Sequence, residues 1–406
     1  MKLLHVIGSM NPQSGGPCQG VRTLSARAIE EGSASVEVVC LDDPQSEYLA
    51  QDTLCIHALG RGRTSWNYQP ALRPWLETNL ARFDAVILNG LWQYQQCALS
   101  RAARRPGAPP YFVFPHGMLD PWFQRAGGRR LKALRNWFYW KVIEQHVVAG
   151  AEALLFTCAE EMRLAADTFH PYQPKHQVSV GFGAASPPPY QNAMEEAFAQ
   201  ACPGAKGKPY FLFLGRIHPK KGVHFLIEAY AALCRSAGAA PPPTLVIAGP
   251  DAEGPYGRKM QDLAAKLCPA NSVCWPGMLT GTAKWGALYN CEASVLPSNQ
   301  ENFGIAVVET LACGRPVLVS DQVNIWREIQ EDGAGLVQKN TVEGTRQLLT
   351  DWMKLSPAEQ SDMAARAKPC FQRRFSIASV NHNLMRVINS KRNPGKFAQN
   401  VQVVSK

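Results

Sequence analysis

The sequence has no long hydrophobic run, no paired cysteine motif and no internal repeat. None of its apolar stretches approaches the ~18 residues that a membrane-spanning helix needs. Its 12 cysteines are scattered singly, with neither a C-x-x-C pair nor another metal-ligand spacing. The sequence therefore predicts a chain without a membrane span, a structural zinc site or a disulfide framework. Its cysteines are expected to serve as small buried hydrophobic residues.

The N-terminus lacks the features of an export signal. MKLLHVIGSM contains one lysine and an apolar stretch too short for a signal-peptide core, and it is typical of a first buried strand. The G-x-G-x-x-G fingerprint of dinucleotide-binding domains and recognisable RNA-binding motifs are also absent. We therefore expect a cytoplasmic protein that binds no nucleic acid.

An excess of positive charge, by contrast, is present. The formal net charge of +10 at pH 7 indicates an anionic partner, such as a phosphate group, a membrane surface or nucleic acid. Residues 101–141 contain nine Lys or Arg and a single acidic residue, Asp120. The segment from Lys391 onward adds four basic residues and no acidic ones, and is expected to form a disordered arm.

The order of the apolar segments predicts an α/β fold. Short apolar runs typical of buried parallel strands alternate with amphipathic stretches such as residues 17–30 and 131–148. The runs expected to be strands are Leu3–Ile7, Val36–Leu41, Ala85–Leu88, Tyr111–Phe114, Ala153–Phe156, Gln177–Val180, Tyr210–Leu214, Thr244–Ala248, Ser272–Trp275, Ala293–Leu296 and Val317–Val319. Two such series predict two doubly wound Rossmann-like domains that face each other across a cleft, where ligands of such sheets bind.

A change in composition sets the expected domain boundaries. After Val180 the chain becomes rich in Gly, Pro and Ala, as linkers between domains often are. The expected divisions are an N-terminal domain (1–190), a linker (191–208), a C-terminal domain (209–375), a C-terminal helix that packs back on the N-terminal domain (376–392) and a flexible basic tail (393–406).

Basic side chains follow the first strand of the predicted C-terminal domain. Tyr210–Leu214 runs into GRIHPKKG, so Arg216 and Lys221 lie in the loop at the carboxyl end of a strand. A guanidinium group offers two parallel hydrogen bonds and an ammonium group offers a point charge, a combination that suits a diphosphate. The alternative is an ordinary solvated basic loop.

Two glutamates stand eight residues apart in PSNQENFGIAVVETLACGRPVLVS, residues 297–320. A helix is expected to begin near Asn302 or Phe303, where Gly304 permits close backbone approach and unpaired N–H groups can hold an anion. If the segment is helical throughout, Glu301 and Glu309 are ~12 Å apart along the axis. The two carboxyl groups of glycosidases lie ~5 Å or ~6.5–9.5 Å apart. Two anchors on one elongated ligand therefore fit better than an acid/base pair, and two solvated carboxylates are the remaining alternative.

Glycines and a histidine stand at strand ends in the predicted N-terminal domain. Gly15 and Gly16 lie between the first expected strand and a helix begun by Pro17, so their backbone N–H groups can approach a ligand. His116 lies just after the strand that ends at Phe114. That position can bring the imidazole into contact with a ligand in the cleft, and a purely structural histidine is the alternative.

Together these motifs resemble the retaining family-4 (group 1) glycosyltransferases, which have the GT-B fold. The GGP loop, HGMLDPW, LFLGRIHPKKG, VIAGP and PSNQENFGIAVVETLACGRPVLVSD occur in order over most of the chain. GRIHPKKG and the last block are the specific ones. HGMLDPW looks most like bacterial enzymes that build exopolysaccharide or lipopolysaccharide.

The resemblance implies a binding site for a nucleoside-diphosphate sugar, the donor, in the C-terminal domain. Arg216 and Lys221 would hold the diphosphate, and Glu309 would bind the ribose hydroxyls. Glu301 would bind the transferred sugar, with His116 beside the sugar's reacting face. The other implied donor contacts are Gly15, Gly16, Gly249, Met278, Asn302, Phe303, Gly304 and Ile305.

The resemblance also bears on the mechanism. Many glycosyltransferases neutralise the departing diphosphate with a divalent metal held by an Asp-x-Asp motif, which this chain lacks; the nearest approach is DAE at 251–253. Arg216, Lys221 and the helix N-terminus near Phe303 can supply positive charge instead, so we expect neither a metal nor another cofactor. The family implies transfer with retention, in which a phosphate oxygen of the donor takes the proton of the acceptor hydroxyl.

The basic segment 122–141 is interleaved with aromatic residues. It contains six Lys or Arg and no acidic residue. A basic, aromatic helix can lie on an anionic bilayer, and many family members glycosylate lipid-linked acceptors. Peripheral contact with the inner face of the cytoplasmic membrane is therefore one reading. The alternative is that the aromatic side chains form core and the basic ones a solvated face.

The expected function is that of a hexosyltransferase that moves a sugar from a nucleotide sugar to a glycan or lipid-linked acceptor in cell-surface polysaccharide biosynthesis. A nucleotide-sugar epimerase and a non-catalytic protein that binds nucleotide sugars or glycans are the alternatives. An epimerase would consume its nucleotide sugar without an acceptor. A binding protein would have little use for a complete set of diphosphate-binding cations.

Overall fold

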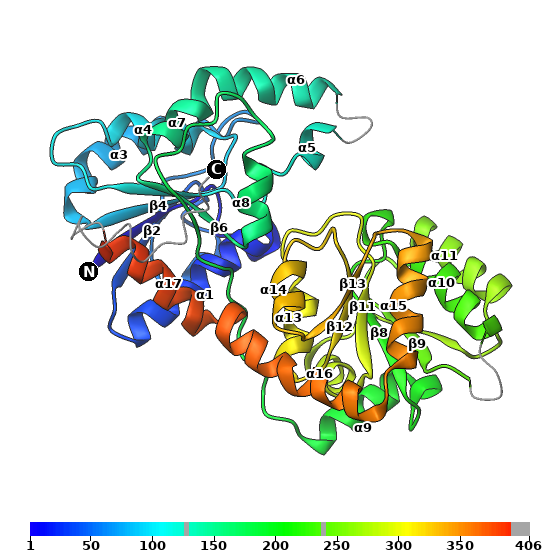
Figure 1. The fold of residues 1–406 in the computed structure, drawn as a ribbon. Coiled ribbons are helices and arrows are strands. Elements are labelled where there is room, and N and C mark those ends of the chain that lie inside the picture. The colour runs from blue at the N-terminus through cyan, green and yellow to red at the C-terminus, as the bar shows by residue number, and fades with distance from the viewer. Residues whose placement is uncertain (126–129, 237–240, 391–406) are drawn as a thin grey trace. The chain divides into compact units, whose positions relative to one another are not determined.

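The computed structural model describes residues 1–125, 130–236 and 241–390 (Figure 1). The chain divides into two compact units. Unit 1 comprises Met1–Gly183 and the C-terminal segment that begins at Ile377, and unit 2 comprises Ala184–Ser376. The basic tail expected over 393–406 lies outside the described residues.

Unit 1 contains a seven-stranded parallel sheet in the order β3-β2-β1-β4-β5-β6-β7. Its strands are β1 (Lys2–Val6), β2 (Ser35–Cys40), β3 (Cys55–Ala58), β4 (Ala85–Asn89), β5 (Tyr111–Phe114), β6 (Ala153–Phe156) and β7 (Gln177–Ser179). The strand order reverses between β1 and β4, which pair directly although β2 and β3 separate them in the sequence. In open α/β sheets, the carboxyl ends of strands beside such a reversal form the usual ligand-binding edge.

Helices pack on both faces of this sheet because both faces are apolar. The helices of unit 1 are α1 (Gly16–Glu30), α2 (Glu47–Ala50), α3 (Leu72–Asn79), α4 (Tyr94–Ala102), α5 (Trp122–Arg125), α6 (Arg130–Tyr139), α7 (Gln145–Gly150), α8 (Ala159–Ala165) and α17 (Ile377–Ser390), with shorter or irregular turns at Pro12–Ser14, Leu80–Arg82 and Trp140–Glu144. Alternate strand residues point to opposite faces, so Leu4 and Leu3 belong to different buried clusters. Leu384 and Ile388 of α17 complete the cluster around Leu3, and α17 runs beside α1 (Figure 1).

Unit 2 contains a six-stranded parallel sheet in the order β10-β9-β8-β11-β12-β13. Its strands are β8 (Tyr210–Leu214), β9 (Thr244–Ala248), β10 (Val273–Gly277), β11 (Ala293–Leu296), β12 (Val317–Ser320) and β13 (Gly335–Gln338). Here the order reverses between β8 and β11, which pair directly. Both units are therefore doubly wound, which confirms the predicted fold class.

The prediction of a linker over 191–208 is corrected by the structure, which folds most of this segment into unit 2. The helices of unit 2 are α9 (Asn192–Ala201), α10 (Val223–Ser236), α11 (Pro255–Leu267), α12 (Gly281–Asn290), α13 (Ile305–Ala312), α14 (Trp326–Glu331), α15 (Val342–Lys354) and α16 (Pro357–Cys370), with turns at Pro203–Ala205, Pro219–Lys221 and Phe371–Phe375. Met194 and Phe198 of α9 are buried. A Cβ on Gly286 of α12 would lie 1.9 Å from the Met194 carbonyl oxygen, so the two helices pack closely. The alanine content that indicated a linker instead favours this helix.

Candidate functional site

Two loops that carry predicted site residues follow the neighbouring strands β8 and β11 of unit 2. Arg216 and Lys221 lie in the loop after β8, and Glu301 lies in the loop after β11. The Lys221 ammonium group forms an ion pair with the Glu301 carboxylate. Burial, together with the positive charges of Lys220 and Arg216, lowers the pKa of Lys221 to about 8. A concentration of cations beside the order reversal makes this edge attractive to an anion.

These two loops are held together by backbone contacts. The Asn299 N–H donates to the Lys220 carbonyl oxygen at 2.8 Å. Gly222 ends the turn that carries Lys221 and has a φ of +69°. A Cβ on Gly222 would lie 2.0 Å from the Pro297 carbonyl oxygen, so only glycine permits this approach. These contacts between the two loops therefore hold Lys221 close to Glu301.

Arg216 is exposed, and within the described part of the chain its guanidinium group has no ion-pair partner. The backbone next to it is fixed by Gly249, whose N–H donates to the Gly277 carbonyl oxygen at 2.8 Å. Gly249 has a φ of +152°, and a Cβ there would lie 1.9 Å from the Gly215 carbonyl oxygen. Glycine is thus required where the loop after β9 meets the loop that carries Arg216. The exposed Arg216 guanidinium group is accessible to a ligand.

Exposed apolar side chains lie at the same edge of the sheet. Met278 directly follows β10, and Ile305 opens α13; both are exposed. Gly249 and Gly277 stand at the carboxyl ends of the adjacent strands β9 and β10. Two of the implied donor contacts, Gly249 and Met278, therefore lie at the ends of neighbouring strands, and an exposed apolar side chain there can pack on a flat ring.

Helix α13 begins at Ile305, two or three residues later than the sequence predicts. Gly304 has a φ of +76°, which is left-handed and outside the helix, and it precedes the first helical residue. The Phe303 side chain is buried, and its ring lies 5.8 Å from that of Phe375. Phe303 is thus a core residue, and only its backbone can contact a donor. The helix N-terminus still lies directly after the Glu301 loop, and its first N–H groups can accommodate an anion.

Glu301 and Glu309 have different lysine partners. The Lys284 ammonium group, from α12, lies 2.7 Å from a carboxylate oxygen of Glu309 and 4.4 Å from the centre of the Trp285 ring. Lys221 instead pairs with Glu301. Because each carboxylate has its own lysine, both can stay ionised without sharing a proton. This arrangement fits two separate anchors on one ligand better than an acid/base pair. Sequence reasoning missed Lys284, because no local pattern distinguishes it.

His116 lies in unit 1, in the loop after β5, and has a φ of +52°. Its Nε2 lies 3.1 Å from the Asn89 side-chain oxygen, and the Asn89 nitrogen lies 3.2 Å from Nδ1 of His5. Because an amide oxygen only accepts, Nε2 of His116 carries the hydrogen and Nδ1 remains an acceptor. Burial, and then the nearby His5, lowers the pKa of His116 to about 3. The imidazole is therefore neutral at pH 7 and can hydrogen-bond a ligand without adding charge.

A buried glutamate of α8 holds the loop that carries His116. One oxygen of Glu161 accepts from the Gly117 N–H at 2.5 Å, and the other accepts from the Thr157 N–H at 2.8 Å. Burial raises the pKa of Glu161, and these hydrogen bonds oppose that rise. Sequence reasoning missed Glu161, because nothing in the sequence distinguishes it from the adjacent Glu160.

Gly15 and Gly16 stand at the start of α1 in unit 1, and Gly15 has a φ of +94°. A Cβ added at either glycine would meet nothing within 4 Å, so the space beside them is open. Asp42 anchors the preceding loop by accepting from the Met10 N–H and the Ser9 hydroxyl, both at 2.6 Å. Open backbone at the N-terminus of a helix is suited to an anionic group.

Helix α6 presents large apolar side chains to solvent. The residues of this apolar α6 face are Leu131, Leu134, Trp137 and Phe138 of α6 and Val142 of the turn that follows it. Single exposed apolar residues are common, but five on adjacent turns are not. Lys132 and Arg135, also exposed, interrupt them. Residues 126–129 of the predicted basic segment lie outside the described residues, and none of the helices within the described ranges has both the length and the apolar character of a membrane span.

Residues of α6 also line a cavity of about 350 Å³ in unit 1. Its lining residues are Ser65, Trp66, Trp92, Arg135, Asn136, Tyr139 and Ile143. Trp92 follows β4 with a φ of +73°, an unusual conformation for a bulky residue that tends to be retained at functional sites. Aromatic rings beside an arginine and an amide suit a sugar, whose apolar face packs on rings while its hydroxyls hydrogen-bond.

Two family models match the chain. Residues 15–183 match the glycosyl transferase 4-like domain, and residues 195–369 match glycosyl transferases group 1. The first region lies within unit 1 and the second within unit 2. Together the two matches cover most of the chain.

Curated relatives match shorter regions. A D-inositol 3-phosphate glycosyltransferase of Jonesia denitrificans is 30% identical over 204 residues, which cover 48% of this chain and 46% of that protein. A glycogen synthase of Mycobacterium tuberculosis is 36% identical over 115 residues, which cover 28% of this chain and 26% of that protein. The aligned part of the chain thus spans less than half the length of these relatives.

Solved structures match over nearly the whole chain. A glycosyltransferase from Rickettsia africae has a TM-score of 0.73 at 13% identity, over 97% of this chain and 98% of that one. HepE of Anabaena in complex with UDP has a TM-score of 0.72 at 15% identity, over 96% of this chain and 100% of that one. At these identities the likeness shows the fold alone, which is the GT-B fold. Since family models match both units, the chain belongs to the group 1 glycosyltransferases.

Proposed function

We propose that this protein is a retaining hexosyltransferase that uses a nucleoside-diphosphate sugar to glycosylate a glycan or lipid-linked acceptor in cell-surface polysaccharide biosynthesis. The observation that carries the proposal is the cationic edge of unit 2. There Arg216 and Lys221 follow β8, Glu301 holds Lys221, and α13 begins just after Glu301. Such an edge binds an anion, and membership of the family makes a nucleoside diphosphate the anion to expect.

Each side chain has its own part in this proposal. Arg216 and Lys221 bind the diphosphate oxygens, and the N-terminus of α13 faces the same group. Glu301, next to Lys221, accepts hydrogen bonds from hydroxyls of the transferred sugar. Glu309, held by Lys284, accepts hydrogen bonds from the ribose.

The proposed transfer replaces one bond at the anomeric carbon by another on the same face of the sugar. The bond to the donor phosphate oxygen breaks, the bond to the acceptor oxygen forms, and the acceptor proton passes to an oxygen of the departing diphosphate. Fixed cations at Arg216 and Lys221 meet the negative charge that develops there. In unit 1, the neutral His116 can accept a hydrogen bond from a ligand through Nδ1 without adding positive charge.

Thermal-shift measurements with UDP-, GDP- and ADP-sugars test the proposal. The structures of Anabaena HepE with UDP and with UDP-glucose make UDP-sugars the first to try. A donor present at ~100 times its Kd should raise the free energy of unfolding by ~2.7 kcal/mol. With an acceptor glycan, we expect sugar transfer and release of the nucleoside diphosphate. Turnover without an acceptor would indicate an epimerase, and binding without turnover would indicate a binding protein.

Transfer is expected to persist in excess EDTA, because Arg216, Lys221 and the α13 N-terminus supply the positive charge that a metal supplies in other enzymes. Initial rates with and without chelator, at one donor concentration, measure this directly. Loss of transfer in EDTA, followed by recovery on addition of Mg²⁺, would show that the reaction needs a metal.

We further propose that the apolar α6 face binds an anionic bilayer and that the aromatic cavity beside it binds the acceptor. The exposed side chains of Leu134 and Phe138 would enter the headgroup region, while Lys132 and Arg135 contact lipid phosphates. A lipid-linked acceptor bound there would have its lipid in the membrane and its sugar near Trp66 and the other cavity residues.

The double variant Leu134→Glu/Phe138→Glu is expected to bind phosphatidylglycerol vesicles at least tenfold more weakly, since burial of one such side chain contributes ~1.5–3 kcal/mol. Vesicle co-sedimentation at low salt measures the binding. Met353→Glu, at another exposed apolar residue, in unit 2, is the control and should bind like the wild type. Equal binding by both variants, or no binding by the wild type, would contradict the proposal.

A further inference from the structure

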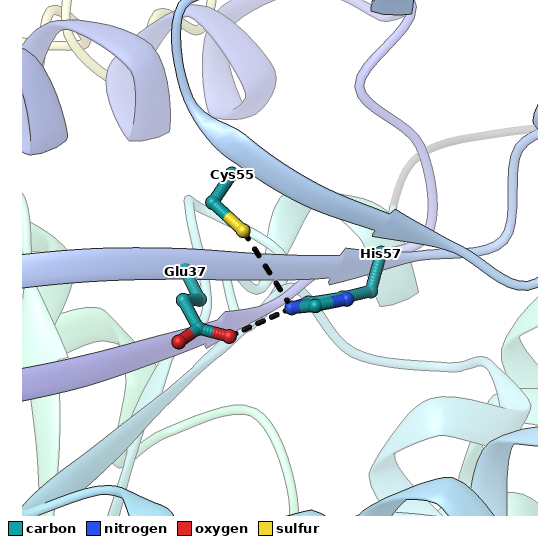
Figure 2. A group of neighbouring side chains, drawn as sticks. All are labelled: Glu37, Cys55 and His57. Atoms are coloured by element: carbon teal, nitrogen blue, oxygen red, sulfur yellow. Dashed lines mark hydrogen bonds and ion pairs between the residues drawn. The ribbon is translucent and has the colours of Figure 1, made fainter.

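Three side chains of different chemistry meet on the outer strands of the unit 1 sheet (Figure 2). Glu37 comes from β2, and Cys55 and His57 come from β3, the edge strand. Glu37 and Cys55 are partners in the parallel register, and Cys55 and His57 are two residues apart, so all three point to one face. Parallel pairing thus assembles a cluster that no spacing in the sequence reveals.

The sulfur and the carboxylate approach the same nitrogen of His57. Nε2 lies 2.7 Å from a Glu37 oxygen and 3.8 Å from the Cys55 sulfur, and the three atoms all lie within 4.8 Å of one another (Figure 2). A catalytic triad needs the nucleophile and the orienting carboxylate on opposite ring nitrogens. This arrangement therefore cannot act as a triad. Three electron-pair donors directed at a common point are instead what a cation requires.

We propose that Glu37, Cys55 and His57 form a Zn²⁺-binding site with its fourth position open to water. Thiolate, imidazole and carboxylate are the ligands that Zn²⁺ takes in proteins. The charges of one thiolate and one carboxylate balance the two charges of the ion. The set is too soft for Mg²⁺ or Ca²⁺, which prefer oxygen ligands alone.

Neighbouring side chains hold these ligands in place. Nη2 of Arg82 lies 3.0 and 3.1 Å from the two oxygens of Glu37. A carboxylate has enough lone pairs to keep this hydrogen bond while it binds an ion, and such outer contacts orient metal ligands. The His57 ring packs beside Trp75, with 5.0 Å between ring centroids. Two of the three ligands are thus positioned before an ion binds.

The proposed site is separate from the chemistry of sugar transfer. Glu37 lies within β2, and Cys55 and His57 lie within β3, so all three ligands come from the strands themselves and not from the loops that follow their carboxyl ends. The predicted donor contacts of unit 1, by contrast, follow strand ends. Zn²⁺ bound here would therefore stabilise the edge of unit 1 and would take no part in the proposed transfer.

Cobalt titration of the full-length, EDTA-treated and reduced protein tests this proposal. One Co²⁺ per chain should bind and produce the near-ultraviolet absorption of a cobalt–thiolate bond, and Zn²⁺ should displace it. Cys55→Ser should abolish that absorption, and His57→Gln should weaken binding at least ~10-fold. His146→Gln, which changes an exposed histidine elsewhere in unit 1, should bind like the wild type. Wild-type protein without the thiolate absorption would overturn the proposal.

Alkylation of Cys55 gives a second readout that does not depend on a variant. All 12 cysteines lie in the described residues, and Cys55 is the exposed one, so it should react first with iodoacetamide. Saturating Zn²⁺ should slow this labelling at least ~10-fold, because the bound thiolate is no longer free. An unchanged labelling rate would overturn the proposal, whatever the effect of Zn²⁺ on transfer.

Discussion

Replacing Arg216 with alanine is expected to lower kcat at least ~100-fold, the scale observed when one transition-state hydrogen-bond donor is lost. Arg216 is exposed and has no ion-pair partner in the described residues, so its removal leaves no buried charge unpaired. The effect should lie in kcat, because the charge on the diphosphate grows as the glycosidic bond breaks. Transfer rates measured over a range of donor concentrations separate kcat from KM.

The matched control is Arg346→Ala, which changes a partly exposed arginine of unit 2 that pairs with Glu343 on the same helix. Such surface pairs contribute ~0.3–0.5 kcal/mol, so melting temperature and transfer should change little. If Arg216→Ala lowers kcat less than ~3-fold, which corresponds to less than ~1 kcal/mol, Arg216 does not stabilise the departing diphosphate.

The interior of the fold could be predicted from local sequence, because the central strands of a parallel sheet are covered on both faces. The bounds of β5, β8 and β11 agree with those expected from their apolar runs. The edge strands β3 and β13 were missed, although the edge strands β7 and β10 were predicted. Both missed strands have only four residues, CIHA and GLVQ, and each contains a polar side chain, so the apolar run is too short to stand out.

The candidate site could be predicted where it depends on the end of a strand, since that is a local property. Arg216 and Lys221 were placed in this way. The side chains that contact the site residues could not be predicted, because these contacts join segments far apart in the sequence. Asn89 orients His116 across 27 residues, and Lys284 reaches Glu309 across 25. The start of α13 was misplaced for a different reason: the left-handed conformation of Gly304 delays the helix.

Glu301→Gln and Glu309→Gln are expected to affect different steps. Glu301→Gln removes a carboxylate from the transferred sugar and should lower kcat ~100-fold. The same change releases Lys221 from its ion pair and removes a negative charge near the diphosphate. Affinity for the sugar-free nucleoside diphosphate should therefore stay the same or rise. Glu309→Gln removes a charged acceptor from the ribose and should weaken nucleoside diphosphate binding ~10-fold, or ~1.4 kcal/mol.

Calorimetric titration with the nucleoside diphosphate, beside transfer kinetics, measures both quantities on the same preparations. Melting temperatures compared with those of Glu343→Gln, an exposed glutamate of unit 2, show whether either change merely destabilises the unit. If both variants lose transfer and nucleotide affinity to the same degree, the two glutamates do not hold different parts of the donor. Opposite changes in affinity would instead follow from their separate lysines, because only the lysine freed by Glu301→Gln lies on the loop proposed to bind the diphosphate.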